Sequence, residues 1–570
     1  MQPESSRRTF VKGLAAAGIL GGLGIWRTPV WAITSPGEPH VLAGTDFDLF
    51  IGETPVNITG NPRTAMTING GIPGPLLRWR EGDIVTLRVR NKLNADTSIH
   101  WHGILLPANM DGVPGLSFHG IEPGGMYVYQ FKVRQNGTYW YHSHSGLQEQ
   151  SGVYGPLVID AKEPEPFEYD RDYVVMLTDW TDEAAAGLMK TLKKQSDYYN
   201  YNKRTVGDFI HDVSEKGWGS TVADRKMWAE MKMNPTDLAD VSGSTYTYLM
   251  NGQAPGMNWT GVFRPGEKLR LRFINGSAMT YFDVRIPGLK MTVVAADGLH
   301  VKPVSVDEFR IAVAETFDVI VEPTQDAYTV FAQSMDRTGY ACGSLAVKMG
   351  VSAPIPPLDP RPMVTMDDMG MGGMDHVSMG GDMAGMDHSA MAGMGDMQSH
   401  PVTESNNPLV DMQAMTTSPK LDDPGLGLRE NGRRVLTYSD LRSSFEDPDG
   451  RDPGRTIELH LTGHMEKFAW SFNGVKFSDA EPLRLKYGER IRIVLVNDTM
   501  MTHPIHLHGM WSDLEDENGQ FMVRKHTIDM PPGSRRSYRV TADALGRWAY
   551  HCHLLYHMEM GMFREVRVEE

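Results

Sequence analysis

The 570-residue chain has few cysteines, few basic residues relative to acidic ones, and no long hydrophobic run. Its two cysteines, Cys342 and Cys552, allow at most one disulfide, which excludes a fold stabilised by several of them. The net charge of −16 argues against a nucleic-acid partner, because such partners need basic surfaces. The 59 glycines and 35 prolines are many for a helical protein and favour an all-β architecture rich in turns.

The start of the chain is typical of an export signal. Arg7 and Arg8 precede an apolar run over about 14–25, which is too short to span a bilayer comfortably. The paired arginines resemble a twin-arginine signal, a type that exports folded proteins, and we expect residues 1–32 to form it. A general secretory signal and an uncleaved anchor are the alternatives.

Three segments share one pattern, which predicts an internal repeat. Residues 82–91, 266–275 and 488–497 each begin with Gly and an acidic residue, continue with alternating apolar residues, and end with Asn. Alternation with a period of two predicts a strand with one buried face, and each segment follows an Asn-Gly turn signal. The sequence therefore predicts three related β-domains, at 40–161, 165–350 and 431–570.

Ten of the twenty histidines lie in four short clusters, at 100–103, 142–144, 503–509 and 551–557. Imidazole and thiolate are preferred ligands of transition metals. The first and third domains each have two His-x-His pairs, at matching offsets. The pairs of the first domain are His100/His102 and His142/His144, and those of the third are His506/His508 and His551/His553. The second domain has Val284 and Ile286 at the offset of the first pair. We therefore expect the first and third domains to share a metal site that the second has lost.

Cys552 lies between two of these histidines, His551 and His553. On a strand, residues i and i+2 share a face, so the cysteine points to a different site from its neighbours. One Cys, two His and one Met form a blue-copper site, and the third domain supplies Cys552, His503, His557 and Met562. The equivalent positions in the first domain lack a soft thiolate, so we expect no such site there.

These four signatures, in this order, resemble those of the multicopper oxidases over residues 45–570. The resemblance implies three cupredoxin-like Greek-key β-barrel or sandwich domains and four copper ions. The type 1 copper would be held by His503, Cys552, His557 and Met562, and the type 2 copper by His100 and His506. The two type 3 coppers would be held by His102, His142 and His553, and by His144, His508 and His551. Such enzymes take single electrons at type 1 copper and reduce dioxygen to water at the other three.

Two carboxylates are candidates for proton transfer under this resemblance. Asp111 lies nine residues after His102 and resembles the acid that these enzymes place near the type 2 copper, although it also suits a turn. Some relatives have an acid directly after the second type 1 histidine, but here that residue is Met558 and the acid is Glu559. The departure puts the proton route on that side in doubt.

Residues 351–430 read as a linker between the second and third domains, and 363–415 are rich in Met, Gly, Asp and His. Residues 363–415 have no amphipathic period and almost no branched aliphatic residue, so the segment should be mobile and build no core. Thioether sulfur favours Cu(I), so we expect additional copper to bind there, with His376, His388 and His400 as further ligands. A second insertion, 184–245, should be partly helical, and its Met227 and Met231 read as packing or as metal ligands.

The export signal, the insertion and the methionine-rich segment together resemble the bacterial copper-resistance members of the family. That implies a periplasmic enzyme that oxidises Cu(I), with dioxygen as acceptor, phenols as further reductants and other copper-resistance proteins as candidate partners. A laccase acting mainly on phenols, and a copper-sequestering store with secondary oxidase activity, are the alternatives.

Overall fold

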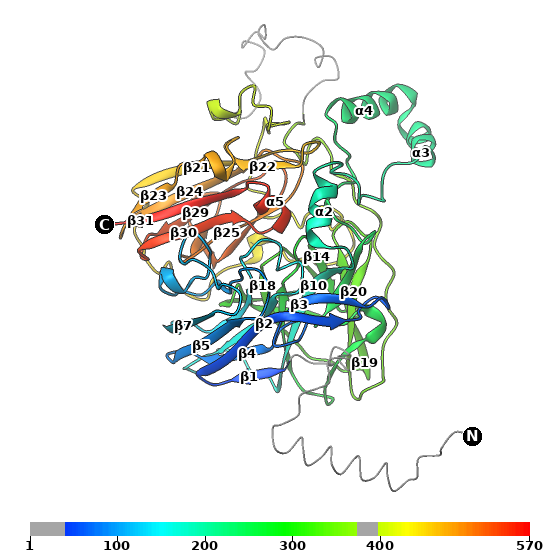
Figure 1. Ribbon diagram of the computed structural model, residues 1–570. Coiled ribbons are helices and arrows are strands. Elements are labelled where there is room, and N and C mark those ends of the chain that lie inside the picture. The colour runs from blue at the N-terminus through cyan, green and yellow to red at the C-terminus, as the bar shows by residue number, and fades with distance from the viewer. Residues whose placement is uncertain (1–39, 373–396) are drawn as a thin grey trace, which may run out of the picture.

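The computed structural model describes residues 40–372 and 397–570. The predicted export signal and the centre of the methionine-rich segment lie outside the described residues. Figure 1 shows strands forming the bulk of the molecule, and the predicted all-β fold class is confirmed. Within the two described ranges, no helix has the length and apolar character needed to cross a membrane.

The first β-domain consists of a five-stranded and a four-stranded sheet. The five-stranded sheet has the order β1 (Val41–Ala43), β4 (Leu76–Arg80), β9 (Tyr154–Asp160), β8 (Gly137–His142) and β6 (His100–His102). The four-stranded sheet has the order β3 (Arg63–Ile68), β2 (Asp46–Val56), β5 (Ile84–Asn91) and β7 (Met126–Lys132).

The second β-domain pairs a six-stranded with a five-stranded sheet. The larger has the order β11 (Tyr246–Met250), β10 (Arg171–Thr181), β13 (Leu269–Asn275), β18 (Thr316–Val321), β15 (Met291–Ala296) and β16 (Leu299–Val306). The smaller has the order β12 (Trp259–Val262), β20 (Tyr340–Ala346), β19 (Ala327–Ser334), β14 (Phe282–Arg285) and β17 (Glu308–Ile311).

The third β-domain repeats this arrangement and adds the short helix α5 (Leu555–Glu559). Its larger sheet has the order β22 (Ala469–Phe472), β21 (Arg455–His464), β24 (Arg490–Asn497), β29 (Arg535–Thr541), β26 (Ser512–Glu515) and β27 (Phe521–Lys525). Its smaller sheet has the order β23 (Leu483–Lys486), β31 (Phe563–Glu569), β30 (Gly546–Cys552), β25 (His503–Leu507) and β28 (Thr527–Met530).

The predicted repeat strand occupies the same place in each domain. β5, β13 and β24 each have one parallel neighbour and one antiparallel neighbour. The asparagine that ends each strand is buried, and its side-chain amide donates to two backbone carbonyls further along the chain, as Asn497 does to Met501 and Met530 at 2.8 Å each. The repeated asparagine thus satisfies backbone acceptors that the loops bury.

The Asn-Gly turns that precede these strands are also used alike. Asn69, Asn251 and Asn473 have φ values of 53°, 50° and 52°, in the left-handed region that asparagine tolerates. In each case the side-chain oxygen accepts from a backbone N–H of the neighbouring strand, at Phe50, Met176 and His460. The sequence repeat therefore reflects shared hydrogen bonding as well as shared burial.

The insertion in the second domain is partly helical, as expected. It contains α2 (Ala185–Leu192), α3 (Val206–Lys216) and α4 (Trp218–Glu230), and Figure 1 shows α3 and α4 standing away from the sheets. Thr205 begins α3 with a reciprocal capping box to Asp208. Short 3₁₀ helices include η1 (Ala108–Met110) and η5 (Val402–Glu404), with others at Pro255–Met257, Tyr438–Asp440 and Phe477–Asp479.

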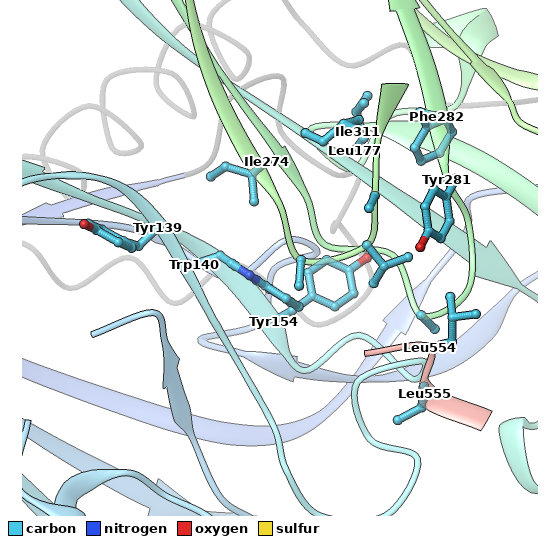
Figure 2. Close-up of a cluster of buried hydrophobic side chains, with 14 of the residues drawn as sticks. Tyr139, Trp140, Tyr154, Leu177, Ile274, Tyr281, Phe282, Ile311, Leu554 and Leu555 are labelled. Atoms are coloured by element: carbon cyan, nitrogen blue, oxygen red, sulfur yellow. The ribbon is translucent and has the colours of Figure 1, made fainter. Parts of the chain in front are cut away.

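A shared hydrophobic core joins the three domains, as Figure 2 shows. Trp140 of the first domain, Ile274 of the second and Leu555 of the third belong to one buried cluster. The backbone N–H of Leu555 also donates to the carbonyl of Ala278 at 2.9 Å. Trp140 and Leu555 each lie two residues from a clustered histidine, so this core fixes the relative positions of the metal-binding strands.

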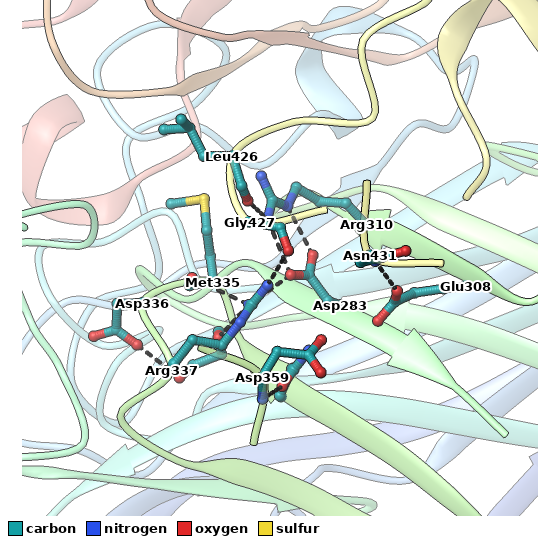
Figure 3. Close-up of polar contacts among 12 residues, drawn as sticks. Asp283, Glu308, Arg310, Met335, Asp336, Arg337, Asp359, Leu426, Gly427 and Asn431 are labelled. Carbon is teal, nitrogen blue, oxygen red and sulfur yellow. Dashed lines mark hydrogen bonds and ion pairs between the residues drawn. The ribbon is translucent and has the colours of Figure 1, made fainter. Parts of the chain in front are cut away.

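The linker 351–430 contributes to the core, so the expectation that its residues 363–415 build none is wrong where the structure describes them. Met369 and Ala414 are fully buried, and Met412 is 6% exposed. Figure 3 shows how polar contacts fasten its end to the second domain: Arg310 donates to the carbonyl of Leu426 at 2.7 Å, and Arg337 donates to the carbonyl of Gly427 at 3.3 Å. The buried residues of the linker show no hydrophobic periodicity in the sequence, because they lie outside strands and helices and are buried one at a time.

The interdomain core gives a stability prediction. Ile274→Ala should lower the free energy of unfolding by about 2–4 kcal/mol, since it leaves a cavity at a fully buried position. Ile210→Ala, on the exposed face of α3, should change it little. Denaturant titration of both variants would measure this, and equal losses would contradict the importance of the shared core.

Candidate copper centres

Four short strands bring the paired histidines together. In the first domain, β6 and β8 are antiparallel, with His100 opposite His142. In the third domain, β25 and β30 are antiparallel, with His506 opposite His551. The equivalent registers place matching His-x-His pairs on facing edges of the two domains.

The pairs meet across the domain boundary. The ring of His100 stacks on that of His508 with centroids 3.9 Å apart, and the ring of His102 stacks on that of His506 at 3.8 Å. His144 Nε2 lies 3.3 Å from His551 Nε2, which lies 3.1 Å from His508 Nε2. The remaining two join the same cluster, since the His553 ring lies 4.8 Å from that of His102 and 5.0 Å from that of His142.

The histidine tautomers are set for metal binding. The Nδ1 atoms of His100, His506 and His551 lie 2.7, 2.6 and 2.9 Å from backbone carbonyls, which only accept hydrogen bonds. Each Nδ1 therefore carries the proton, and the Nε2 lone pair faces the cluster. His142 Nδ1 likewise lies 2.7 Å from the Glu149 carboxylate.

Several ring nitrogens in this cluster are buried and have no hydrogen-bond partner within the described residues. They are Nε2 of His100, His142 and His506, and both ring nitrogens of His102 and His553. Unsatisfied buried nitrogens destabilise a fold unless something else binds them. Burial also lowers the pKa of His102, His142 and His553 well below the usual value, so the rings are neutral. Neutral, unpartnered imidazoles fit a transition-metal ion.

A second buried group surrounds Cys552. Its Sγ lies 3.5 Å from His503 Nδ1 and 4.0 Å from His557 Nδ1, and these two nitrogens are 3.1 Å apart. Met562 is fully buried, and its backbone carbonyl accepts from the N–H of Cys552. Burial raises the pKa of the Cys552 thiol, which would become a ligand by losing its proton to a bound metal. This donor set fits copper.

Comparison with known proteins agrees with this geometry. Family models described as "Multicopper oxidase" match residues 51–164, 171–348 and 450–570. The chain belongs to the multicopper oxidases. It is 78% identical to "Copper resistance protein A homolog" of Pseudomonas syringae pv. tomato and 72% identical to "Copper resistance protein A" of Escherichia coli, each over 100% of both chains. The family resemblance drawn from the sequence is confirmed.

Solved structures show the same fold at low sequence identity. Fet3p, a multicopper oxidase that functions in iron import, is 19% identical, with a TM-score of 0.65 over 93% of this chain and 91% of that one. The laccase from Botrytis aclada is 20% identical, with a TM-score of 0.60 over 95% of this chain and 90% of that one. Both support the cupredoxin-like fold class of this multicopper oxidase.

Asp111 and Glu559 lie in different surroundings. Asp111 follows η1, is buried, and contacts both domains' histidines: its Oδ2 lies 2.8 Å from His508 Nδ1, and its carbonyl lies 2.7 Å from His100 Nδ1. Its other carboxylate oxygen has no hydrogen-bond partner in the described residues. Glu559 is exposed at the end of α5 and has no described contact with the clustered histidines.

Three neighbours of the candidate copper ligands were not predicted from the sequence. Asp240, in the helical insertion, has Oδ2 2.6 Å from His557 Nε2, and burial raises the pKa of Asp240 to about 8. Glu149 contacts His142 as described above. His526 has its ring centroid 4.7 Å from that of His102, and its Nε2 is buried without a partner. Glu149 follows a cluster closely enough to have been suspected, whereas no sequence signal indicated the other two.

The neutral histidines predict acid sensitivity of the copper-free protein. Their folded pKa values lie below the unfolded value of about 6.5; that of His551 is lowered by burial to about 4. The unfolded chain therefore binds more protons in this window, and the free energy of unfolding should fall as pH drops below about 6.5, by about 1.4 kcal/mol per pH unit for each such histidine.

Denaturant titrations between about pH 7 and pH 5 would measure this slope. His102→Gln should make it shallower, whereas His211→Gln, at an exposed position on α3, should leave it unchanged. An identical slope in all three proteins would show that the buried rings do not control it.

Proposed function

We propose that this multicopper oxidase oxidises Cu(I) to Cu(II) in the periplasm as part of copper resistance, with dioxygen as the electron acceptor. The observation that carries the proposal is the 72–78% identity with copper resistance protein A over full length, in a chain that retains all twelve candidate ligands. Phenols are expected as further reductants, and export by the twin-arginine route agrees with the paired arginines at the start.

We assign the twelve ligands as the family pattern implies. His503, Cys552, His557 and Met562 would hold type 1 copper, and His100 and His506 type 2 copper. His102, His142 and His553 would hold one type 3 copper, and His144, His508 and His551 the other. Bound copper would supply one-electron oxidation at the first site and four-electron reduction of dioxygen to water at the other three.

The chain positions the two sites for electron transfer. His551 and His553 face the cluster of paired histidines, and Cys552 between them faces His503 and His557. A single stretch of backbone therefore joins the two sites. Asp240 fixes the ring of His557 from the other side, so the helical insertion contributes directly to the surroundings of the type 1 site.

Asp111 is the better supported of the two proton-transfer candidates. It orients His100 and His508 together, and its Oδ1 is buried 3.4 Å from His100 Nδ1 without a hydrogen bond in the described residues. A carboxylate there can hold a proton close to where dioxygen would be reduced. Glu559 lies outside hydrogen-bond reach of the cluster, so we do not assign proton delivery to it.

The type 1 assignment predicts that Cys552→Ser abolishes both the intense thiolate-to-copper absorption band and the oxidase activity, because a hydroxyl cannot replace the thiolate. Cys342→Ser is the matched control, since Cys342 is buried on β20 with the carbonyl of Pro255 as its neighbour and should retain both properties. Visible absorption and oxygen uptake would measure them. A blue Cys552→Ser protein would refute the assignment.

Oxygen uptake separates the three functions. A Cu(I) oxidase should consume one dioxygen for every four Cu(I) added, a laccase should respond mainly to phenols, and a copper store should take up Cu(I) without consuming dioxygen.

The methionine-rich segment is proposed to bind additional Cu(I). Replacement of Met374, Met379, Met383, Met386, Met391 and Met394, all outside the described residues, by Leu should lower the Cu(I) bound per chain and leave the blue band intact. If Cu(I) binding and oxidation were unchanged, the segment would only connect the second and third domains, and the proposal that it binds Cu(I) would be wrong.

A further inference from the structure

Two histidines and two carboxylates form a separate cluster beside the third domain. His400 lies in the described end of the methionine-rich segment, Glu404 ends η5, His460 lies on β21, and Asp498 follows β24. One ligand-capable atom of each lies within 4.8 Å of those of the others. None of these four residues belongs to the copper centres described above.

The distances within the cluster are those of groups around a common centre. His400 Nδ1 lies 3.2 Å from Asp498 Oδ2 and 3.3 Å from Glu404 Oε2. His460 Nδ1 lies 2.6 Å from Asp498 Oδ2 and 3.7 Å from Glu404 Oε1. Ligands roughly 2.0 Å from one metal ion are separated by about 2.8 Å when adjacent and about 4 Å when opposite. The three longer contacts fall in this range, and the shortest would lengthen on binding.

Burial and missing partners point to a ligand. Glu404, His460 and Asp498 are 3%, 1% and 0% exposed. Glu404 Oε1 is a buried atom without a hydrogen-bond partner in the described residues, and His460 Nδ1 lies 3.7 Å from it. A buried carboxylate oxygen without a donor is costly, and a cation at this point would satisfy it.

The orientation of His400 indicates which of its atoms would bind. Its Nε2 lies 3.0 Å from the carbonyl of Ala414, which can only accept, so Nε2 carries a proton. In the neutral ring the Nδ1 lone pair then faces two carboxylates, which is repulsive unless a proton or a metal ion lies between them. His460 is held alike, with Nε2 3.2 Å from Glu458 and Nδ1 directed at Asp498. Such outer hydrogen bonds commonly orient metal-bound histidines.

We propose that His400, Glu404, His460 and Asp498 bind one Cu(II) ion. Two imidazole nitrogens and two carboxylate oxygens suit Cu(II), whereas Cu(I) prefers the thioether sulfur of the adjacent segment. The site therefore takes the product of Cu(I) oxidation. That identification of the ion as product rests on the proposed function, whereas the binding of Cu(II) itself does not.

The location of the cluster agrees with such a role. His400 is four residues from the end of the undescribed methionine-rich part, and Asp498 precedes Thr499, whose hydroxyl lies 2.7 Å from Nε2 of the type 1 ligand His503. One member of the cluster is therefore close in sequence to the proposed Cu(I)-binding methionines, and another is adjacent to a residue that contacts the proposed type 1 site. Bound Cu(II) would also fasten His400 to the third domain.

The alternative occupant is a proton. Burial lowers the pKa of His400, but the carboxylates of Asp498 and Glu404 outweigh it and raise the pKa to about 10. Without metal, the ring would thus form an imidazolium between two carboxylates. Cu(II) must displace that proton, and measurement of binding decides between the two occupants.

The test begins with full-length protein loaded with its four coppers and freed of loosely bound metal. Aerobic titration with Cu(II), followed by calorimetry and electron paramagnetic resonance, should show one tight Cu(II) more in the wild type than in His460→Gln or Glu404→Gln, with affinity at this site reduced at least roughly tenfold in each variant. His464→Gln, on the same strand and outside the cluster, is the control and should bind like the wild type. All three should keep the blue band and phenol turnover.

A crystal of the wild-type protein soaked in Cu(II) gives a second, variant-independent measurement. An anomalous peak between His400 Nδ1 and His460 Nδ1 would support the site even if a variant failed to fold. Equal Cu(II) binding by the wild type and both cluster variants, or no peak at this position, would overturn the proposal and leave a protonated ion-pair network. Oxygen uptake with Cu(I) tests the oxidase separately, so its failure would refute the product role without affecting the binding result.

Discussion

Buried, neutral imidazoles facing one another across a domain boundary are the constraint on which the rest of this structure depends. Eight imidazole rings from two domains lie close enough to contact, and several of their nitrogens have no partner among the described residues. That arrangement is unfavourable for a bare polypeptide. It persists because the strands that carry the rings are fixed on both sides, by antiparallel registers within each domain and by the core that joins all three domains.

The second domain illustrates how a repeat can lose its ligands and keep a structural role. Its strand β14 carries Val284 at the offset where the other domains carry histidine, and that residue is fully buried. Its core residues belong to the same buried cluster as those of the other two domains, and its helical insertion brings Asp240 to the proposed type 1 ligand His557. The domain without copper ligands thus orders the ligands of its neighbours.

The proposed copper sites differ in the softness of their ligands. Sulfur from Cys552 and Met562 joins two imidazoles at the proposed type 1 site, and methionine is frequent in the sequence of residues 363–415. Imidazoles line the proposed dioxygen-reducing cluster, and imidazoles with carboxylates form the group around Asp498. Soft sulfur favours Cu(I), and nitrogen with oxygen favours Cu(II). A copper ion oxidised by this enzyme would move from sulfur ligands toward nitrogen and oxygen ligands.

The sequence by itself determined the threefold β-repeat, the paired histidines and the Cys552 signature, because strand periodicity and ligand chemistry are both local. The family resemblance also implied that Asp111 lies near the proposed type 2 ligands. The tertiary structure decided what depends on contacts between distant segments: Asp240 against His557, His526 beside His102, and His400 beside Asp498. It also showed that Met369 and Met412 are packed singly, which no periodic pattern could reveal. Loops outside the repeat make these contacts, and their paths are set by packing rather than by sequence period.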